Sequence, residues 1–161
     1  MASLLNKTIV KVARFIPVKN RFNYYKVAPE ALENVMQMEM YVRKIKLDPK
    51  LKELIKLLAS LINGCPFCIQ MHTKGARKLK ATDEEINELR EWQQSSQFTD
   101  EEKMAFELTE RITLISESGV SDELYERARQ YYDEREYFDL IFVITQVNTW
   151  NRIAILMGNE P

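Results

Sequence analysis

Residues that break helices are scarce in this chain, and they stand where helices would begin or end. The 161 residues include only four glycines and five prolines. Pro49 and Pro66 suit the first turn of a helix, where the N–H that proline lacks has no partner in any case. Gly64 suits the left-handed position that ends many helices. This distribution excludes a loop-rich or collagen-like chain and favours a fold built of helices.

Capping signals and periodicity divide the chain into helices. Thr82 with Glu85, and Thr99 with Glu102, match the capping box, in which each side chain bonds to the other residue's backbone N–H. Apolar residues recur at spacings of three and four between these signals, as on the buried face of an amphipathic helix. The sequence therefore predicts an all-α fold, a single-domain helical bundle, with helices near 4–15, 29–46, 49–63, 66–80, 83–93, 100–117, 122–133 and 135–157.

The first twenty residues differ from the rest of the chain. They contain four basic residues and no acidic ones, and their apolar residues fall on one face of a possible helix. Such a helix can bind a membrane surface or act as a targeting segment, but amphipathic helices more often pack on protein. We therefore predict an N-terminal amphipathic extension over 1–20, packed on the domain or on another subunit, and a helical domain over 21–161.

Charge and composition narrow the possible partners. The chain has 23 basic and 24 acidic residues, so we expect no binding of nucleic acid driven by overall charge. The most apolar stretch, 138–157, contains Asp139, Gln146 and Arg152, which a lipid-facing helix rarely carries. We expect this stretch to be a buried central helix and the protein to have no membrane partner. The predicted compartment is the cytoplasm, where thiols start reduced.

The residues with the clearest chemistry lie close together. Cys65, Cys68 and His72, which are both cysteines and the only histidine, fall within eight consecutive residues. Two cysteines at this spacing, at the start of a helix, can close a small disulfide ring, and the helix N-terminus favours their thiolates. His72 follows Cys68 by four residues, so both lie on one helical face, within reach of proton exchange.

A carboxylate is predicted to complete this group. Glu53 precedes Cys65 by twelve residues, and a turn at Asn63-Gly64 between two antiparallel helices would bring it alongside His72. A carboxylate beside an imidazole fixes the tautomer and raises the basicity of the ring. Cys68, Cys65, His72 and Glu53 are therefore the candidate catalytic residues.

Two other interpretations of this group were weighed. Buried cysteines often serve only as small apolar side chains. The four residues also amount to a possible zinc ligand set, but ligands from a single hairpin would need strained geometry to surround an ion. The clustering favours a redox dithiol over both, and we expect no metal and no cofactor.

The pattern Glu-x11-Cys-x-x-Cys-x3-His resembles the alkylhydroperoxidase D (AhpD)-like branch of the carboxymuconolactone decarboxylase family. The similarity runs from about Arg21 to Met157. Within that range, the segments 25–29, 41–43, 63–68, 71–74 and 150–152 resemble the family as well. The resemblance implies an all-helical subunit, a redox site on a helical hairpin, and a homo-oligomer (dimer, trimer or hexamer).

The resemblance also implies roles for the site residues. Cys68 would attack peroxide, Cys65 would resolve the sulfenic acid, and Glu53 and His72 would form the proton relay. The best-known peroxidase members carry a histidine where this chain has Phe67, so protons cannot follow the same path here. The true decarboxylases of the wider family lack the cysteine pair, which disfavours lactone decarboxylation.

We therefore expect a thiol-dependent hydroperoxide reductase whose partners are a hydroperoxide substrate and a dithiol protein reductant. The first alternative is a general disulfide oxidoreductase with weak peroxide activity. In that enzyme Cys65, nearer the helix end and expected to be the more exposed, would be the attacking thiol. The second alternative is a non-catalytic oligomeric redox sensor or scaffold, in which the disulfide alters a subunit contact.

Overall fold

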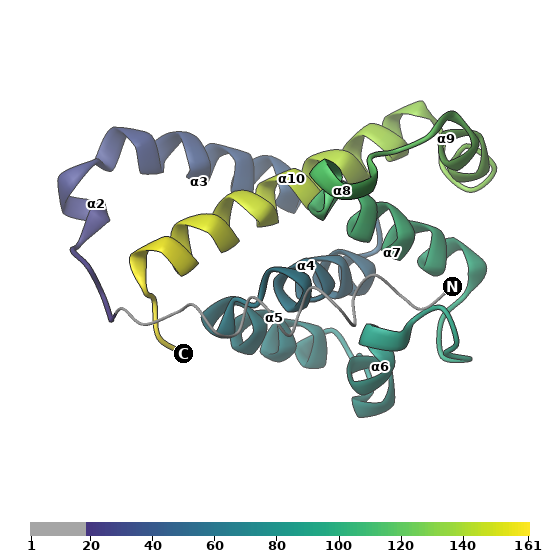
Figure 1. The fold of residues 1–161 in the computed structure, drawn as a ribbon, viewed down its shortest axis with the longest axis horizontal. Coiled ribbons are helices and arrows are strands. Elements are labelled where there is room, and N and C mark those ends of the chain that lie inside the picture. The colour runs from purple at the N-terminus through teal and green to yellow at the C-terminus, as the bar shows by residue number, and fades with distance from the viewer. Residues whose placement is uncertain (1–18) are drawn as a thin grey trace.

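Helix α4 (Pro49–Asn63) lies at the centre of the fold. It contacts α5 (Pro66–Lys78), α7 (Asp100–Thr113) and α10 (Glu134–Met157), and α10 also packs on α3 (Pro29–Lys44). The computed structural model describes residues 19–161, and all regular structure within that range is helical (Figure 1). The shorter helices are α2 (Tyr24–Val27), α6 (Asp83–Glu88), the 3-10 helix η1 (Leu89–Glu91), α8 (Ile115–Ser118) and α9 (Asp122–Ala128). The predicted all-α class is confirmed.

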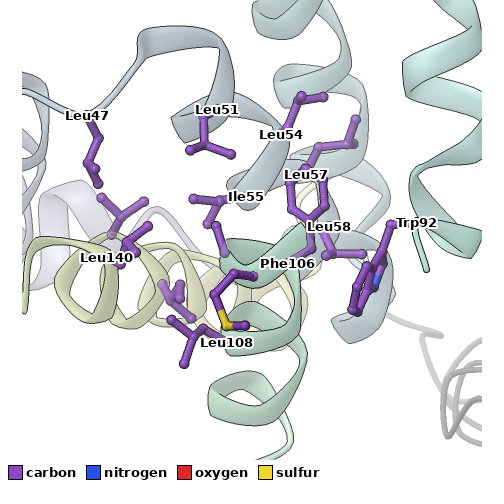
Figure 2. Packing of buried hydrophobic residues seen from close by; sticks show 14 of the residues in the cluster. Leu47, Leu51, Leu54, Ile55, Leu57, Leu58, Trp92, Phe106, Leu108 and Leu140 are labelled. Carbon is purple, nitrogen blue, oxygen red and sulfur yellow. The ribbon is translucent and has the colours of Figure 1, made fainter. Parts of the chain in front are cut away.

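The core forms around α4 because that helix is apolar on most of its circumference. Leu54, Ile55 and Leu58 are fully buried, and they pack with Phe106 of α7 and Leu140 of α10 (Figure 2). Truncating one such leucine to alanine costs about 2–5 kcal/mol, since the cavity that remains refills only in part. Of the two helices that carry the candidate site, α4 belongs to this core and α5 packs on it.

The observed helix starts match the bounds predicted from the sequence better than the observed helix ends do. Both predicted capping boxes are present, at Thr82 and at Thr99. The helix predicted over 100–117 is instead interrupted at Leu114, and the one predicted over 122–133 ends at Ala128. The helix predicted to reach residue 80 ends at Lys78, and Lys80 has the left-handed φ of 69°. These ends lack the glycine that would mark them in the sequence.

Helix α10 is, among the described residues, the one helix long and apolar enough to cross a membrane by length and composition. Four of its polar side chains are nevertheless buried: Asp139, Gln146, Asn148 and Asn151. Asn148 donates to Thr113 of α7 at 3.0 Å, and Asn151 donates to Ser60 of α4 at 3.1 Å. These contacts are those of a core helix, as the sequence predicted for 138–157.

The start of the described chain is tied to its end. The backbone N–H groups of Asn20 and Arg21 donate to the carbonyls of Gly158 and Met157, both at 3.1 Å. We call this pair of bonds the terminal clasp. Residues 1–18, which include the helix predicted over 4–15, lie outside the described range.

Candidate active site

The cysteine pair sits at the turn between α4 and α5. Gly64 ends α4 with φ 67° and ψ 43°, a left-handed conformation that glycine adopts without strain. The N–H groups of Gly64 and Cys65 both donate to the carbonyl of Ser60. Cys65 is the N-cap of α5, and its Sγ accepts a hydrogen bond from the N–H of Cys68 at 3.3 Å. The predicted helical hairpin is therefore present, with Pro66 in the first turn of α5.

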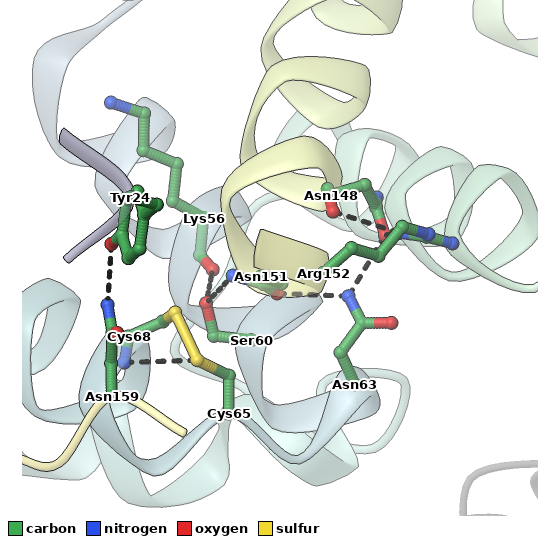
Figure 3. Close-up of a disulfide and its surroundings, with 10 residues drawn as sticks. All are labelled: Tyr24, Lys56, Ser60, Asn63, Cys65, Cys68, Asn148, Asn151, Arg152 and Asn159. Carbon is green, nitrogen blue, oxygen red and sulfur yellow. Dashed lines mark hydrogen bonds between the residues drawn. A yellow bond between two sulfur atoms is a disulfide. The ribbon is translucent and has the colours of Figure 1, made fainter. Parts of the chain in front are cut away.

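Cys65 and Cys68 are joined in a disulfide, with their Cα atoms 5.3 Å apart (Figure 3). Each cysteine is only 1% exposed, and the pair forms a buried cluster with Ala154 of α10. The expectation that Cys65 is the more exposed thiol is therefore wrong. The C-terminal part of α10 covers the helix start, which the local sequence around Cys65 cannot reveal.

A network of amides holds this turn against α10. The side-chain NH₂ of Asn63 donates to the Oδ1 atoms of Asn148 and Asn151, both at 2.9 Å. Asn151 in turn donates to Oγ of Ser60, whose backbone carbonyl accepts the two N–H groups of the turn (Figure 3). Because these groups are buried and bonded to one another, displacing one leaves its partners without hydrogen bonds.

His72 and Glu53 meet across the hairpin, as its register predicted. Nδ1 of His72 lies 3.0 Å from Oε2 of Glu53, and the two side chains are 8% and 20% exposed. Burial opposes ionisation of Glu53, but the hydrogen bond and charge of His72, together with the charge of Lys56, outweigh it and lower the pKa of Glu53. An ionised carboxylate only accepts hydrogen bonds, so Nδ1 carries a proton, and in the neutral form of the ring Nε2 is the acceptor atom.

A cavity of about 910 Å³ reaches this group of residues. Cys68, His72 and Glu53 all contribute to its lining, whereas Cys65 does not line it. Apolar side chains form much of the remaining wall: Tyr24, Tyr25, Met36, Phe67, Met71, Leu79, Val147 and Trp150. The largely apolar cavity therefore reaches both Cys68 and His72.

Two charged residues next to Glu53 were not singled out from the sequence. Lys56 follows Glu53 by three residues on α4, and that spacing alone places them together on one face. Glu39 comes from α3 and joins Lys56 only through tertiary packing. Among the residues that the structure describes, no three histidine, cysteine or acidic side chains gather in a way that could hold a metal ion.

Residues 29–111 match the model of the carboxymuconolactone decarboxylase family. The chain is 46% identical over 143 residues to the uncharacterised protein YdfG of Bacillus subtilis (strain 168), a match covering 89% of this chain and 97% of that protein. It is 24% identical over 102 residues to the uncharacterised protein YnjA of Escherichia coli (strain K12), covering 63% of this chain and 56% of that protein.

Two solved structures share this architecture. The first is a protein of unknown function from Agrobacterium tumefaciens, provisionally described as the antioxidant defence protein AhpD. It is 37% identical, with a TM-score of 0.85, and the match covers 88% of this chain and 97% of that one. The second is an uncharacterised peroxidase-related protein from Silicibacter sp. TM1040, which is 19% identical with a TM-score of 0.76. The match covers 99% of this chain and 87% of that one, and at this identity it shows the fold alone.

Proposed function

Because this chain belongs to the carboxymuconolactone decarboxylase family, in its AhpD-like branch, we propose that it is a thiol-dependent hydroperoxide reductase. One observation carries the proposal. A cysteine that can form a disulfide with its neighbour lines a largely apolar cavity, next to a histidine whose Nδ1 is bonded to a carboxylate. These are the parts that a two-cysteine peroxidase needs.

In the first step the Cys68 thiol loses its proton to Nε2 of His72, and the thiolate attacks the outer oxygen of the hydroperoxide. An S–O bond forms as the O–O bond breaks, and the departing alkoxide takes a proton to leave as an alcohol. Cys68 is thereby oxidised to a sulfenic acid. Glu53 stabilises the imidazolium that exists between the two proton transfers.

In the second step the Cys65 thiol attacks the sulfenic sulfur of Cys68, which forms the disulfide and releases water. Their Cα separation of 5.3 Å already suits the bond. An external dithiol then reduces the disulfide by thiol–disulfide exchange and becomes a disulfide itself. Because this cycle needs a reducing compartment, we propose that the protein works in the cytoplasm.

The position of the two sulfur atoms supports Cys68 as the attacking residue. Cys68 lines the cavity, while Cys65 lies behind it as the N-cap of α5. A disulfide oxidoreductase of the usual kind would instead need an accessible Cys65. Both cysteines are 1% exposed, but only Cys68 lines the cavity. This burial favours a small substrate over a protein disulfide as the partner in the first step.

Anaerobic titration of the fully reduced protein with cumene hydroperoxide tests the proposal. The wild-type protein should lose two thiols per peroxide, Cys68→Ser should consume none, and Cys65→Ser should complete one turnover and leave a sulfenic acid that dimedone traps at Cys68. A trapped adduct at Cys65 would support the disulfide oxidoreductase instead. Equally slow reaction of all three proteins would leave only a sensor or scaffold.

A further inference from the structure

A buried ammonium group stands beside the Glu53–His72 pair. Nζ of Lys56 lies 3.5 Å from Oε1 of Glu53 and 3.8 Å from Oε1 of Glu39, and its side chain is 8% exposed. The other oxygen of each carboxylate has a different partner: Oε2 of Glu53 faces His72, and Oε2 of Glu39 accepts a hydrogen bond from Gln146. These contacts link Gln146 of α10 to Glu39 of α3, and Glu39 to Lys56 of α4. Lys56 and Glu53 of α4 then continue the series to His72 of α5.

We propose that Lys56 is a positioning residue that stands between two partly buried carboxylates and keeps the Glu53–His72 pair ready to accept a proton. The proposal rests on the proposed function only in taking His72 as the base for Cys68. It adds Lys56, a residue of the cavity lining to which the mechanism above gives no role.

The physical reason is the balance of charge around the pair. With Lys56 present, one ammonium group offsets part of the negative charge of the two carboxylates, which would otherwise draw a proton to the pair. Without Lys56, two carboxylates face each other in a partly buried site, where repulsion is stronger than in water. The Glu53–His72 pair would then take up a proton at a higher pH. A pair that already holds this proton cannot take another from the Cys68 thiol.

Other charged or titratable groups near the pair do not replace Lys56. Arg43 of α3 lies 3.4 Å from Oε1 of Glu39, but 70% of its side chain is exposed, so solvent screens its charge. The remaining titratable groups that line the cavity are Lys74 and Lys78 of α5, Tyr24 and Tyr25 of α2, and Cys68. Helix α10 contributes only uncharged side chains to this lining.

The chain offers a matched control on the same helix. Lys52 precedes Lys56 by one turn and is similarly buried, but its Nζ donates to the backbone carbonyls of Val42 and Ile45, at 3.3 and 2.7 Å. Replacing either lysine with methionine removes a buried charge and keeps the length of the side chain. Lys56 contacts the carboxylate of Glu53 directly, whereas Lys52 acts on it only through its charge at longer range, so replacing Lys52 should shift the imidazole midpoint less.

The experiment follows the imidazole of His72 by NMR as a function of pH. This is the only histidine, so its signals need no deconvolution. The protein is used in its disulfide form, in which neither cysteine titrates, so the readout requires no peroxide activity. We expect Lys56→Met to move the midpoint of the imidazole titration upwards by about one pH unit or more, the usual effect of a close charge.

Three further variants sharpen the result. Lys56→Arg should restore the wild-type midpoint, and Glu39→Gln combined with Lys56→Met should move it back towards the wild type because one repelling carboxylate is gone. Lys56→Gln provides a second neutral variant in case the methionine variant does not fold. An unchanged midpoint in the neutral Lys56 variants, or an equal shift in Lys52→Met, would overturn the proposal.

Peroxide kinetics distinguish a failure of the role proposed for Lys56 from a failure of the proposed peroxidase function. In reduced protein, Lys56→Met should move the acid limb of the pH–rate profile for Cys68 oxidation in the same direction as the imidazole midpoint. If the midpoint shifts but no variant consumes peroxide, the proposed function fails and the role of Lys56 stands. If peroxide is consumed while neither the midpoint nor the acid limb moves, the role of Lys56 fails and the function stands.

Discussion

The carboxylate of Glu53 occupies the space that a side chain on Gly75 would need. A Cβ atom built on Gly75 would overlap Oε2 of Glu53 and lie 3.1 Å from its Cδ. Gly75 is within α5, where glycine costs about 1 kcal/mol relative to alanine. Glycine is needed at this turn of the helix because the carboxylate of Glu53 must pass close to its backbone to reach His72.

Gly75→Ala should therefore push Glu53 away from His72. We expect slower oxidation of Cys68 by cumene hydroperoxide, although helix propensity alone would stabilise α5 by about 0.5–1 kcal/mol. Stopped-flow measurement of thiol loss gives the rate, and urea unfolding gives the stability. The matched control is the same substitution in a Glu53→Ala background, where the space is empty and Gly75→Ala should have no further effect on the rate. An equal loss in both backgrounds would contradict this explanation.

His72→Ala should slow the oxidation of Cys68 by about 10²-fold or more, because the thiol loses its nearest base. Glu53→Gln should slow it less, since Glu53 acts through the imidazole. Arg77→Ala, on the same helix but outside the cavity lining, is the control and should react like the wild type. A larger loss in Glu53→Gln than in His72→Ala would argue against this order of roles.

Phe67→His should raise the rate of peroxide consumption. Phe67 lines the cavity and packs against the cysteine pair, so an imidazole there would stand next to Cys68. The measurement is the second-order rate constant for cumene hydroperoxide, with Phe67→Leu as a control for the loss of the ring. A rate no higher than that of the leucine variant would show that an imidazole at this position has no effect.

The stability of the protein should depend on Glu53 in acid. Its native pKa lies below the ordinary value of about 4.5, so its contribution is fully present above that pH and is lost as the pH falls through the lower native pKa. Urea unfolding at a series of pH values should show a shallower decline for Glu53→Gln than for the wild type. The exposed Glu84→Gln should decline like the wild type, and parallel curves for all three proteins would contradict the assignment.

We expect the chain to form a homo-oligomer. Several large apolar side chains remain exposed, among them Phe138 and Leu156 on α10 and Met36 and Met40 on α3. Such side chains gain most from burial against another subunit. Light scattering at micromolar concentration measures the mass, and a stable particle of 19.0 kDa would contradict this prediction.

Helix starts could be read from the sequence because caps are local. Asp48 caps α4 and Thr99 caps α7 through bonds to residues three positions away. Helix ends such as those near Lys80 and Leu114 depend instead on how the chain packs, and no residue type marks them. The four-residue helix α2 was missed because it buries no residue and so leaves no periodic pattern.

In the site, too, contacts set by local sequence could be predicted and contacts set by tertiary packing could not. Contact between Glu53 and His72 followed from the register of one hairpin, which the turn at Gly64 fixes. The approach of Glu39 to Lys56 and the cover that Ala154 places over the cysteines come from helices distant in the sequence. Spacing along the chain carries no information about such contacts.

The terminal clasp bears on how a buried sulfur is reached. The backbone bonds of Asn20 and Arg21 hold the end of α10. A 2.9 Å bond also joins Asn159 to the Tyr24 hydroxyl (Figure 3), and both of these residues line the cavity. The C-terminal end of a chain frays with far less free energy than global unfolding requires, and fraying of residues 157–161 would release the clasp. Fraying here would expose the Cys68 side of the disulfide while α4 and its core stay folded. The amide hydrogens of Asn20 and Arg21 should accordingly exchange with solvent long before those of Leu54 and Leu58.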